Sequence, residues 1–216
     1  MQRFLFPKWA NQAPRYFGLG LACFAGFSGL LLWYYATNKH FEVGYAPVQP
    51  VEFSHKLHAG DVGMDCRYCH SSVERSAFAA VPPTQTCMNC HSKVRADSTK
   101  LLLVRESAAF DKPLPWVRVH QLPQFVYFDH SAHLAAGVGC SSCHGRIDQM
   151  PRVTQSQPLS MSWCLDCHRN PGPALRPASE VTNMAWQPPP EADRSEPIAA
   201  TGRKVAPPTH CSGCHR

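Results

Sequence analysis

The sequence predicts a mostly irregular fold of short α-helices behind one N-terminal transmembrane helix. Three observations lead to this prediction. The chain has 20 prolines and 13 glycines among 216 residues, one long apolar segment near its N-terminus, and 11 cysteines. Proline and glycine at this frequency interrupt long regular elements. Leu, Ile, Val and Phe are sparse after residue 40, so the rest of the chain has to pack around something other than its own side chains.

The apolar segment covers residues 16–37, which carry no charged side chain and can cross a hydrocarbon core of about 30 Å as a helix. Three basic residues precede it and one follows closely, namely Arg3, Lys8, Arg15 and Lys39. By the positive-inside rule, residues 1–15 lie in the cytoplasm. A cleaved signal peptide is the alternative, but the segment is too long for one and ends in aromatic residues. We therefore expect a single-pass anchor in the cytoplasmic (inner) membrane, with the remaining chain on the periplasmic side.

Ten of the cysteines form five C-x-x-C pairs, and a histidine follows each pair at once. The pairs are Cys66/Cys69, Cys87/Cys90, Cys140/Cys143, Cys164/Cys167 and Cys211/Cys214, and the histidines are His70, His91, His144, His168 and His215. C-x-x-C-H is the attachment site of a c-type haem, in which both thiols add to the porphyrin vinyl groups and the imidazole becomes the proximal iron ligand. Zinc sites, thioredoxin-like pairs and disulfides do not need a histidine after every pair. The motifs therefore predict five covalently bound c-type haems.

The sequence after the anchor contains an internal repeat. The phrase F-x-H-x-x-H precedes the first and the third haem motif, at Phe53–His58 and Phe128–His133. A duplicated two-haem module is the simplest explanation. The predicted divisions are a first module at 38–95, a connector at 96–119, a second module at 120–170, a proline-rich connector at 171–209 and the fifth haem site at 210–216.

Histidines outside the five motifs are candidates for the sixth iron ligands. An H-x-x-H pair on a helical turn directs its two imidazoles toward two different irons. Five irons need five such ligands, and the candidates are His55, His58, His120, His130 and His133. The fifth haem motif has no F-x-H-x-x-H phrase of its own, so a methionine stays open as its sixth ligand. The three candidates for that position are Met150, Met161 and Met184.

The F-x-H-x-x-H phrase before C-x-x-C-H resembles the multihaem cytochrome c3 and c7 group. The resemblance implies that His55 and His130 each ligate the haem that follows, while His58 and His133 reach other haems. The single anchor, the five motifs and the segments 116–123 and 159–164 also resemble the pentahaem subunit of alternative complex III. That resemblance implies a bacterial quinol-oxidising respiratory complex, with an iron–sulfur subunit and an integral-membrane quinol-binding subunit as partners.

These features together indicate a function in electron transfer. Irons with both axial positions filled bind no substrate and relay single electrons. We expect a membrane-anchored pentahaem cytochrome without catalytic residues, carrying electrons from a quinol-oxidising partner subunit to a soluble or complex-bound periplasmic acceptor. A single-helix quinol dehydrogenase and a catalytic multihaem reductase are the alternatives. The net charge of +6 is scattered without long runs, so nucleic acid is not an expected partner.

Overall fold

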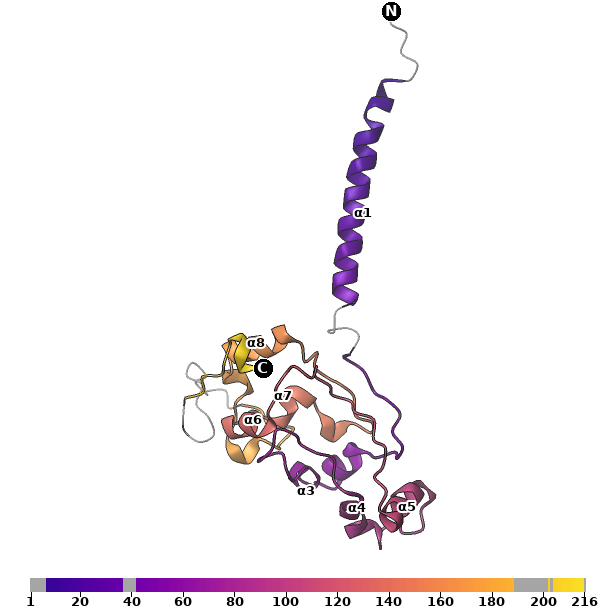
Figure 1. The fold of residues 1–216 in the computed structure, drawn as a ribbon, viewed down its shortest axis with the longest axis vertical. Coiled ribbons are helices and arrows are strands. Elements are labelled where there is room, and N and C mark those ends of the chain that lie inside the picture. Colours follow the sequence, from indigo (N-terminus) through magenta and orange to yellow (C-terminus); the bar gives the residue numbers. More distant parts are fainter. Residues whose placement is uncertain (1–6, 37–41, 189–201, 203, 216) are drawn as a thin grey trace, which may run out of the picture.

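The computed structural model describes residues 7–36, 42–188, 202 and 204–215. Figure 1 shows one long helix and a head made of short helices joined by irregular chain. No sheet forms in these ranges, where isolated β-bridges join Val126 with His215 and Val138 with Leu175. The predicted fold class, short helices in a largely irregular chain with one N-terminal apolar helix, is confirmed.

The long helix is α1, Ala13–Tyr35, which follows a 3-10 turn, η1, at Lys8–Asn11. Pro14 lies in its first turn, where a missing backbone N–H costs nothing because that group has no partner in the helix. None of the 23 residues of α1 is buried. The helical stretch Trp9–Tyr35 is 27 residues long, and an 18-residue window within it has a mean hydropathy of 1.6. By length and composition it can span a membrane, and α1 begins and ends slightly earlier than the predicted segment.

The head contains six short α-helices and several single turns. The α-helices are α3 (Cys66–Cys69), α4 (Thr84–His91), α5 (Leu102–Phe110), α6 (His130–Ala136), α7 (Cys140–His144) and α8 (Met161–Arg169). The turns are η2 (Lys56–Asp61), η3 (Thr99–Leu101), η4 (Ile147–Gln149), η5 (Gly172–Ala174), η6 (Ala178–Glu180) and η7 (Cys211–Gly213). The η2 turn is a π-helix and the other η elements are 3-10 turns.

Side-chain caps explain where three of these helices begin. The carboxylate of Asp65 accepts a hydrogen bond from the Arg67 N–H at the start of α3, at 2.8 Å. Asp129 accepts from two backbone N–H groups of α6. Ser160 Oγ accepts from one, the Trp163 N–H, at the start of α8. Such caps satisfy backbone donors that have no partner inside the helix. At its other end α6 stops at Gly137, which has a φ of +92° and so suits the left-handed C-cap conformation.

The head has very little apolar core of its own. Among the described residues the buried apolar side chains are Val51, Val73, Val104, Val181 and Met184, and no side chain is less than 2% exposed. Large apolar side chains stay open instead, for example Phe78 at 68% and Phe110 at 70% exposure. A soluble head with this surface needs another apolar group to cover it.

The helices are distributed along the length of the head. Figure 1 shows α4 and α5 at one end, α8 with the C-terminal turn at the other, and α6 and α7 between them. The predicted connector at 96–119 includes α5, which packs on α4 through a 2.7 Å hydrogen bond between Thr84 Oγ1 and Ser107 Oγ. The end of this connector is held by Gln49, whose side-chain amide makes two hydrogen bonds to the backbone of Val117.

Candidate haem sites

All five C-x-x-C pairs lie on single helical turns. The first four fall within α3, α4, α7 and α8, and the fifth is in and just after η7. On a helix, residues three apart share one face and the residue after them continues it. Each turn therefore presents two thiols and one imidazole on the same side. None of the 11 cysteines forms a disulfide, so the thiols are in the form to which a haem attaches.

The motif histidines are held through the Nδ1 atom of the ring. Nδ1 of His70, His91, His168 and His215 contacts the backbone oxygens of Ala80 (2.7 Å), Val94 (2.9 Å), Pro208 (2.7 Å) and Phe125 (3.2 Å), respectively. A carbonyl oxygen only accepts, so Nδ1 carries the proton and Nε2 keeps its lone pair. Metal-bound imidazoles are typically oriented by this kind of second hydrogen bond. Sequence patterns gave no sign of these carbonyl groups, because any residue supplies one.

The two F-x-H-x-x-H phrases have the same local geometry. Phe53 meets the ring of His55 edge-on at 4.8 Å between centroids and lies along that of His58 at 4.4 Å. Phe128 does the same with His130 and His133, at 4.7 and 4.5 Å. The phenylalanine thus separates the two imidazoles and fixes the angle between them. This is a physical reason for the three-residue pattern to recur as a unit.

Three of the phrase histidines are also anchored through Nδ1. Each donates to a backbone oxygen: His58 to that of Ser54 at 2.9 Å, His130 to that of Ala77 at 2.7 Å and His133 to that of Asp129 at 2.6 Å. His55 differs, since its Nδ1 is buried without a hydrogen-bond partner among the described residues. His58, His130 and His133 therefore also offer Nε2 as their free atom.

Motif and phrase histidines face each other in pairs. The ring centroids of His58 and His91 are 6.1 Å apart, those of His133 and His168 6.1 Å, and those of His130 and His144 6.4 Å. Two metal–nitrogen bonds of about 2 Å place two axial imidazoles with centroids about 6 Å apart. The fourth phrase histidine, His55, lies close enough to His70 to feel its charge. The ring distances thus bring a second imidazole to the second, third and fourth motifs.

The fifth motif and His120 do not fit this pattern. The ring beside His215 is Phe125, at 5.7 Å between centroids, and no second imidazole pairs with it in the described part of the chain. His120 lies instead behind His144, with its Nε2 3.4 Å from His144 Nδ1 and the two rings nearly perpendicular. The structure therefore does not bring His120 to the fifth motif.

Thiols of different motifs lie next to one another. Cys66 and Cys140 share a hydrogen bond between their side chains, which lowers the pKa of Cys66 to about 7 and raises that of Cys140. Burial, with Cys87 adding, raises the pKa of Cys69. Burial, with Cys167 and Cys164 adding, raises the pKa of Cys143 to about 12. Thiols of the first four motifs therefore influence those of another motif.

Comparison with known proteins agrees with this geometry. Residues 51–107 and 126–216, well over half of the chain, match the family described as cytochrome c7 and related cytochrome c. The chain belongs to this family. A curated relative is the menaquinone reductase, multihaem cytochrome c subunit, of Nitratidesulfovibrio vulgaris, which is 35% identical over 135 residues. The match covers 62% of this chain and 59% of that protein, so the chain spans about three-fifths of the length of its relative.

As a cytochrome c7 relative, the chain carries covalently bound c-type haem, and the site residues fit this group. Burial lowers the pKa of His55 to about 4, with His70 and His58 adding to the effect. Burial likewise lowers the pKa of His144 to about 3, with His120 and His130 adding, and lowers that of His133. These imidazoles are uncharged at neutral pH, which is the form that ligates iron.

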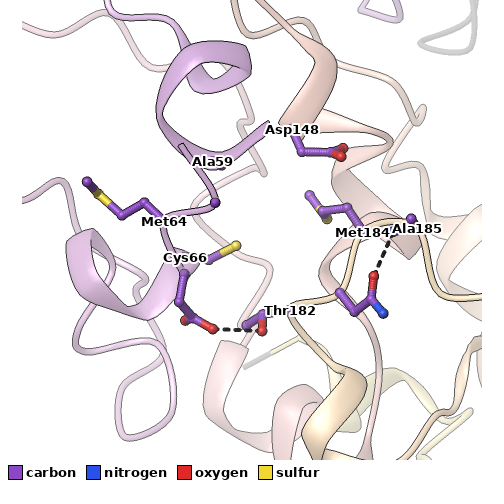
Figure 2. Close-up of a pocket in the computed structure, with 10 residues that line it drawn as sticks. Ala59, Met64, Cys66, Asp148, Thr182, Met184 and Ala185 are labelled. Carbon is purple, nitrogen blue, oxygen red and sulfur yellow. Dashed lines mark hydrogen bonds between the residues drawn. The ribbon is translucent and has the colours of Figure 1, made fainter. Parts of the chain in front are cut away.

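The methionines that the sequence offered for the fifth site of this cytochrome lie in different places. Met184 is 8% exposed and lines a pocket of about 270 Å³ with Cys66, at the first motif (Figure 2). Met150 does not line this pocket. Its backbone oxygen accepts a hydrogen bond from the Lys56 N–H at the start of η2. Met161 is 69% exposed and begins α8, the helix of the fourth motif. The thiol of Cys164 in α8 is influenced by Cys214, so α8 is next to the fifth motif.

Sequence analysis missed one side chain near the third motif of this cytochrome. The guanidinium group of Arg176 packs against Gly139, just before α7, and lies 4.9 Å from the centroid of the Trp186 ring. It donates to the Asn183 oxygen at 3.1 Å and to Ser141 Oγ at 3.2 Å, while its Nε is buried without a partner. Arg176 thereby joins the proline-rich segment to the start of α7. A lone arginine in an irregular segment has no pattern by which to predict such a role.

Proposed function

We propose that this chain is the membrane-anchored pentahaem electron-relay subunit of a quinol-oxidising respiratory complex. The observation that carries the proposal is the facing of a second imidazole toward the motif histidines of the second, third and fourth sites, with buried His55 influenced by His70 of the first. Bound haem supplies one-electron redox chemistry. An iron held by two imidazoles has no open position for a substrate, so the side chains favour relay over catalysis.

Each residue type has a distinct part in this proposal. The ten motif cysteines, Cys66, Cys69, Cys87, Cys90, Cys140, Cys143, Cys164, Cys167, Cys211 and Cys214, attach five haems. The proximal ligands are His70, His91, His144, His168 and His215, and the distal ligands of the first four irons are His55, His58, His130 and His133. We infer two-haem modules at 38–95 and 120–170 and a separate site at 210–216. The two matched family segments, 51–107 and 126–216, support this division.

We also infer the setting of the chain. The apolar helix anchors it in the cytoplasmic membrane, with the N-terminus inside and the haem head on the periplasmic side, as the basic residues before α1 suggest. The partners are a quinol-binding membrane subunit and an iron–sulfur subunit, as in alternative complex III, together with an electron acceptor. The relative named as a subunit of menaquinone reductase supports a place beside a quinone-reacting protein.

Two measurements test this function. Intact mass of the mature protein should show five increments of about 0.6 kDa, one for each C-x-x-C-H motif. Duroquinol should reduce the haems in the isolated membrane complex but not in the purified chain alone, because one helix offers no wall for a quinone pocket. Rapid quinol oxidation by the purified chain would instead identify it as a quinol dehydrogenase. Four or fewer haems in mature protein would exclude the pentahaem proposal.

A further inference from the structure

We propose that the five haem sites form one unbranched row in the order second, first, third, fourth, fifth, and that electrons enter and leave the chain at the second and fifth sites. Sites are numbered by motif along the chain. This inference rests on the relay function and adds to it the path and the two surfaces that meet electron-transfer partners. One electron taken from a donor partner is matched by one delivered to an acceptor partner, and no bond in the chain is made or broken.

Thiol positions report haem positions because the thioether bonds lie at the edge of the porphyrin. Two motifs whose turns lie close together would therefore hold two neighbouring haems. A phrase histidine that reaches from one site to another adds a second link of the same kind. Both kinds of link can be followed through the head.

The second and first sites are joined by three contacts. Cys87 of the second motif is close enough to Cys69 of the first for its charge to act there. Between the same two motifs, the Asn89 side-chain amide donates to the Tyr68 hydroxyl at 3.1 Å. His58, one turn after the first-site ligand His55, faces His91 of the second site.

The next link joins the first site to the third and breaks the order of the sequence. The turn η2, which follows His55, packs on η4, just after the third motif, and the Lys56 N–H donates to the Met150 oxygen at 3.0 Å. The Cys66 and Cys140 thiols also influence each other's pKa. The backbone agrees, since the His130 backbone N–H and its ring Nδ1 both contact the Ala77 oxygen, at 3.3 and 2.7 Å. The first site, not the second, is therefore the neighbour of the second module.

The remaining links run on to the C-terminus. His133, one turn after His130 of the third site, faces His168 of the fourth with ring centroids 6.1 Å apart. The thiols of the fourth motif also act on the pKa of Cys143, and Cys214 of the fifth acts on that of Cys164. The ring of His168 donates to the Pro208 oxygen at 2.7 Å, three residues before the fifth motif begins. In the described residues no contact joins the thiols of the second and fifth motifs.

The two ends of this row are also its open sites. Among the ten motif cysteines, Cys90 of the second site and Cys211 of the fifth are exposed, and the other eight are partly covered. Figure 1 shows α4 at one end of the head and the C-terminal turn at the other, with α7 between them. A partner would thus approach a haem more readily at either end than in the middle, where the motif cysteines are partly covered.

A matched pair of variants tests the order on the full-length holoprotein. Cys66→Ala/Cys69→Ala removes the first haem and Cys87→Ala/Cys90→Ala the second, and intact mass should show four haems in each. Neighbouring irons sense one another's charge, so a potentiometric titration counts neighbours. Loss of the first haem should shift the midpoints of two others, and loss of the second should shift one. If loss of the first haem shifts one midpoint and loss of the second shifts two, the haems follow the order of the sequence and the proposed row is wrong.

A second pair of variants allows the number of shifted midpoint potentials to be measured even if a haem-deficient variant does not mature. His55→Met and His58→Met leave all ten thiols in place and change the potential of the first or second iron alone. The charge on the altered iron then changes at a different point of the titration. The first variant should again shift two neighbouring midpoints and the second one, and equal counts would contradict the row.

Reduction by duroquinol in the membrane complex tests the two ends. Without the first haem, part of the remaining haem should stay oxidised on the wild-type time scale: one of four if electrons enter at the fifth site, three of four if they enter at the second. Complete, rapid reduction would overturn the row. A wild-type complex that duroquinol does not reduce would refute the relay function, while the titration would still decide the order.

Discussion

His120 contacts the motif histidine His144 and so differs in role from the histidines that are candidate iron ligands. Its Nε2 lies 3.4 Å from Nδ1 of His144, so His144 can donate its Nδ1 proton to it and keep Nε2 free. The other motif histidines with a resolved Nδ1 partner use a backbone carbonyl for the same purpose. Burial, with His130 adding, lowers the pKa of His120, which keeps its ring neutral and able to accept.

We therefore expect His120→Ala to alter the third haem without releasing a ligand from any iron. The variant should keep five haems and an all-low-spin electron paramagnetic resonance spectrum, while the midpoint of one haem shifts because His144 loses its acceptor. His120→Gln, which restores an acceptor, should recover most of the shift. A new high-spin signal in His120→Ala would show that His120 is an iron ligand after all.

The position of Met161 leads to a second expectation at this scale. It begins α8, the helix that contacts the fifth motif, whereas Met184 lies buried at the first. We expect a thioether-to-iron charge-transfer band in the oxidised protein that Met161→Leu abolishes and the control Met184→Leu leaves intact. A thioether ligand raises the haem potential, so one midpoint should also fall in Met161→Leu. If neither variant changes the spectrum, methionine does not ligate the fifth iron.

Individual elements in this head are held by polar contacts more than by apolar ones. Asp65 illustrates this, because its carboxylate caps α3, pairs with the Arg67 side chain at 2.9 Å and accepts from Thr182 Oγ1 at 3.0 Å. Thr182 lies 117 positions further along the chain. One side chain therefore fixes the start of the first motif and joins it to the proline-rich segment. Figure 2 shows the contact between the two beside Cys66.

Replacing Asp65 with Ala should lower the free energy of unfolding at pH 7 by about 1 kcal/mol, the usual cost of losing an N-cap. Hydrogen bonding to Arg67 lowers the pKa of Asp65 from 3.8 to about 2. Since the folded value is the lower one, its charge stabilises the fold above about pH 4 and the effect is lost as the pH falls to about 2.

Denaturant unfolding at pH 7 and pH 3 measures this difference. The difference between wild type and Asp65→Ala should shrink at the lower pH. Glu52→Ala is the matched control, because Glu52 pairs with Lys100 on an open surface, where such pairs contribute little. An unchanged stability in Asp65→Ala would remove the cap from this account.

The whole head is built around groups that are not amino acids. Its five buried apolar side chains are far fewer than a conventional core needs to offset the conformational entropy lost on folding. Covalently bound c-type haem would supply apolar surface against the open aromatic and aliphatic side chains of the head. We therefore expect folding of this cytochrome to be coupled to attachment of its cofactor.

Protein matured without haem should accordingly lack a cooperative fold. We expect a variant with all ten motif cysteines changed to Ala to lose near-ultraviolet circular dichroism and to be digested rapidly after residue 41. The holoprotein should resist the same protease and unfold in a single transition. A haem-free chain that unfolds cooperatively would show that the polypeptide supplies its own core.

Sequence alone determined the features whose cause is local. An apolar helix needs only one continuous segment, and a C-x-x-C-H motif needs only a turn, so both were predicted, and the family match confirms the c7 likeness. The repeat also identified the four phrase histidines as candidate ligands, although their assignment to particular irons stays a prediction. These features depend on residues within about one or two helical turns of each other.

Tertiary structure alone decided which distant turns became neighbours. The first motif meets the third through Cys66 and Cys140, His120 stands behind His144 instead of at the fifth site, and Arg176 reaches α7 from the proline-rich segment. No periodicity encodes such pairings, because they arise from many weak contacts between irregular segments whose separate free energies are small. The order that we propose for the haem sites follows from that packing and therefore departs from the order of the motifs along the chain.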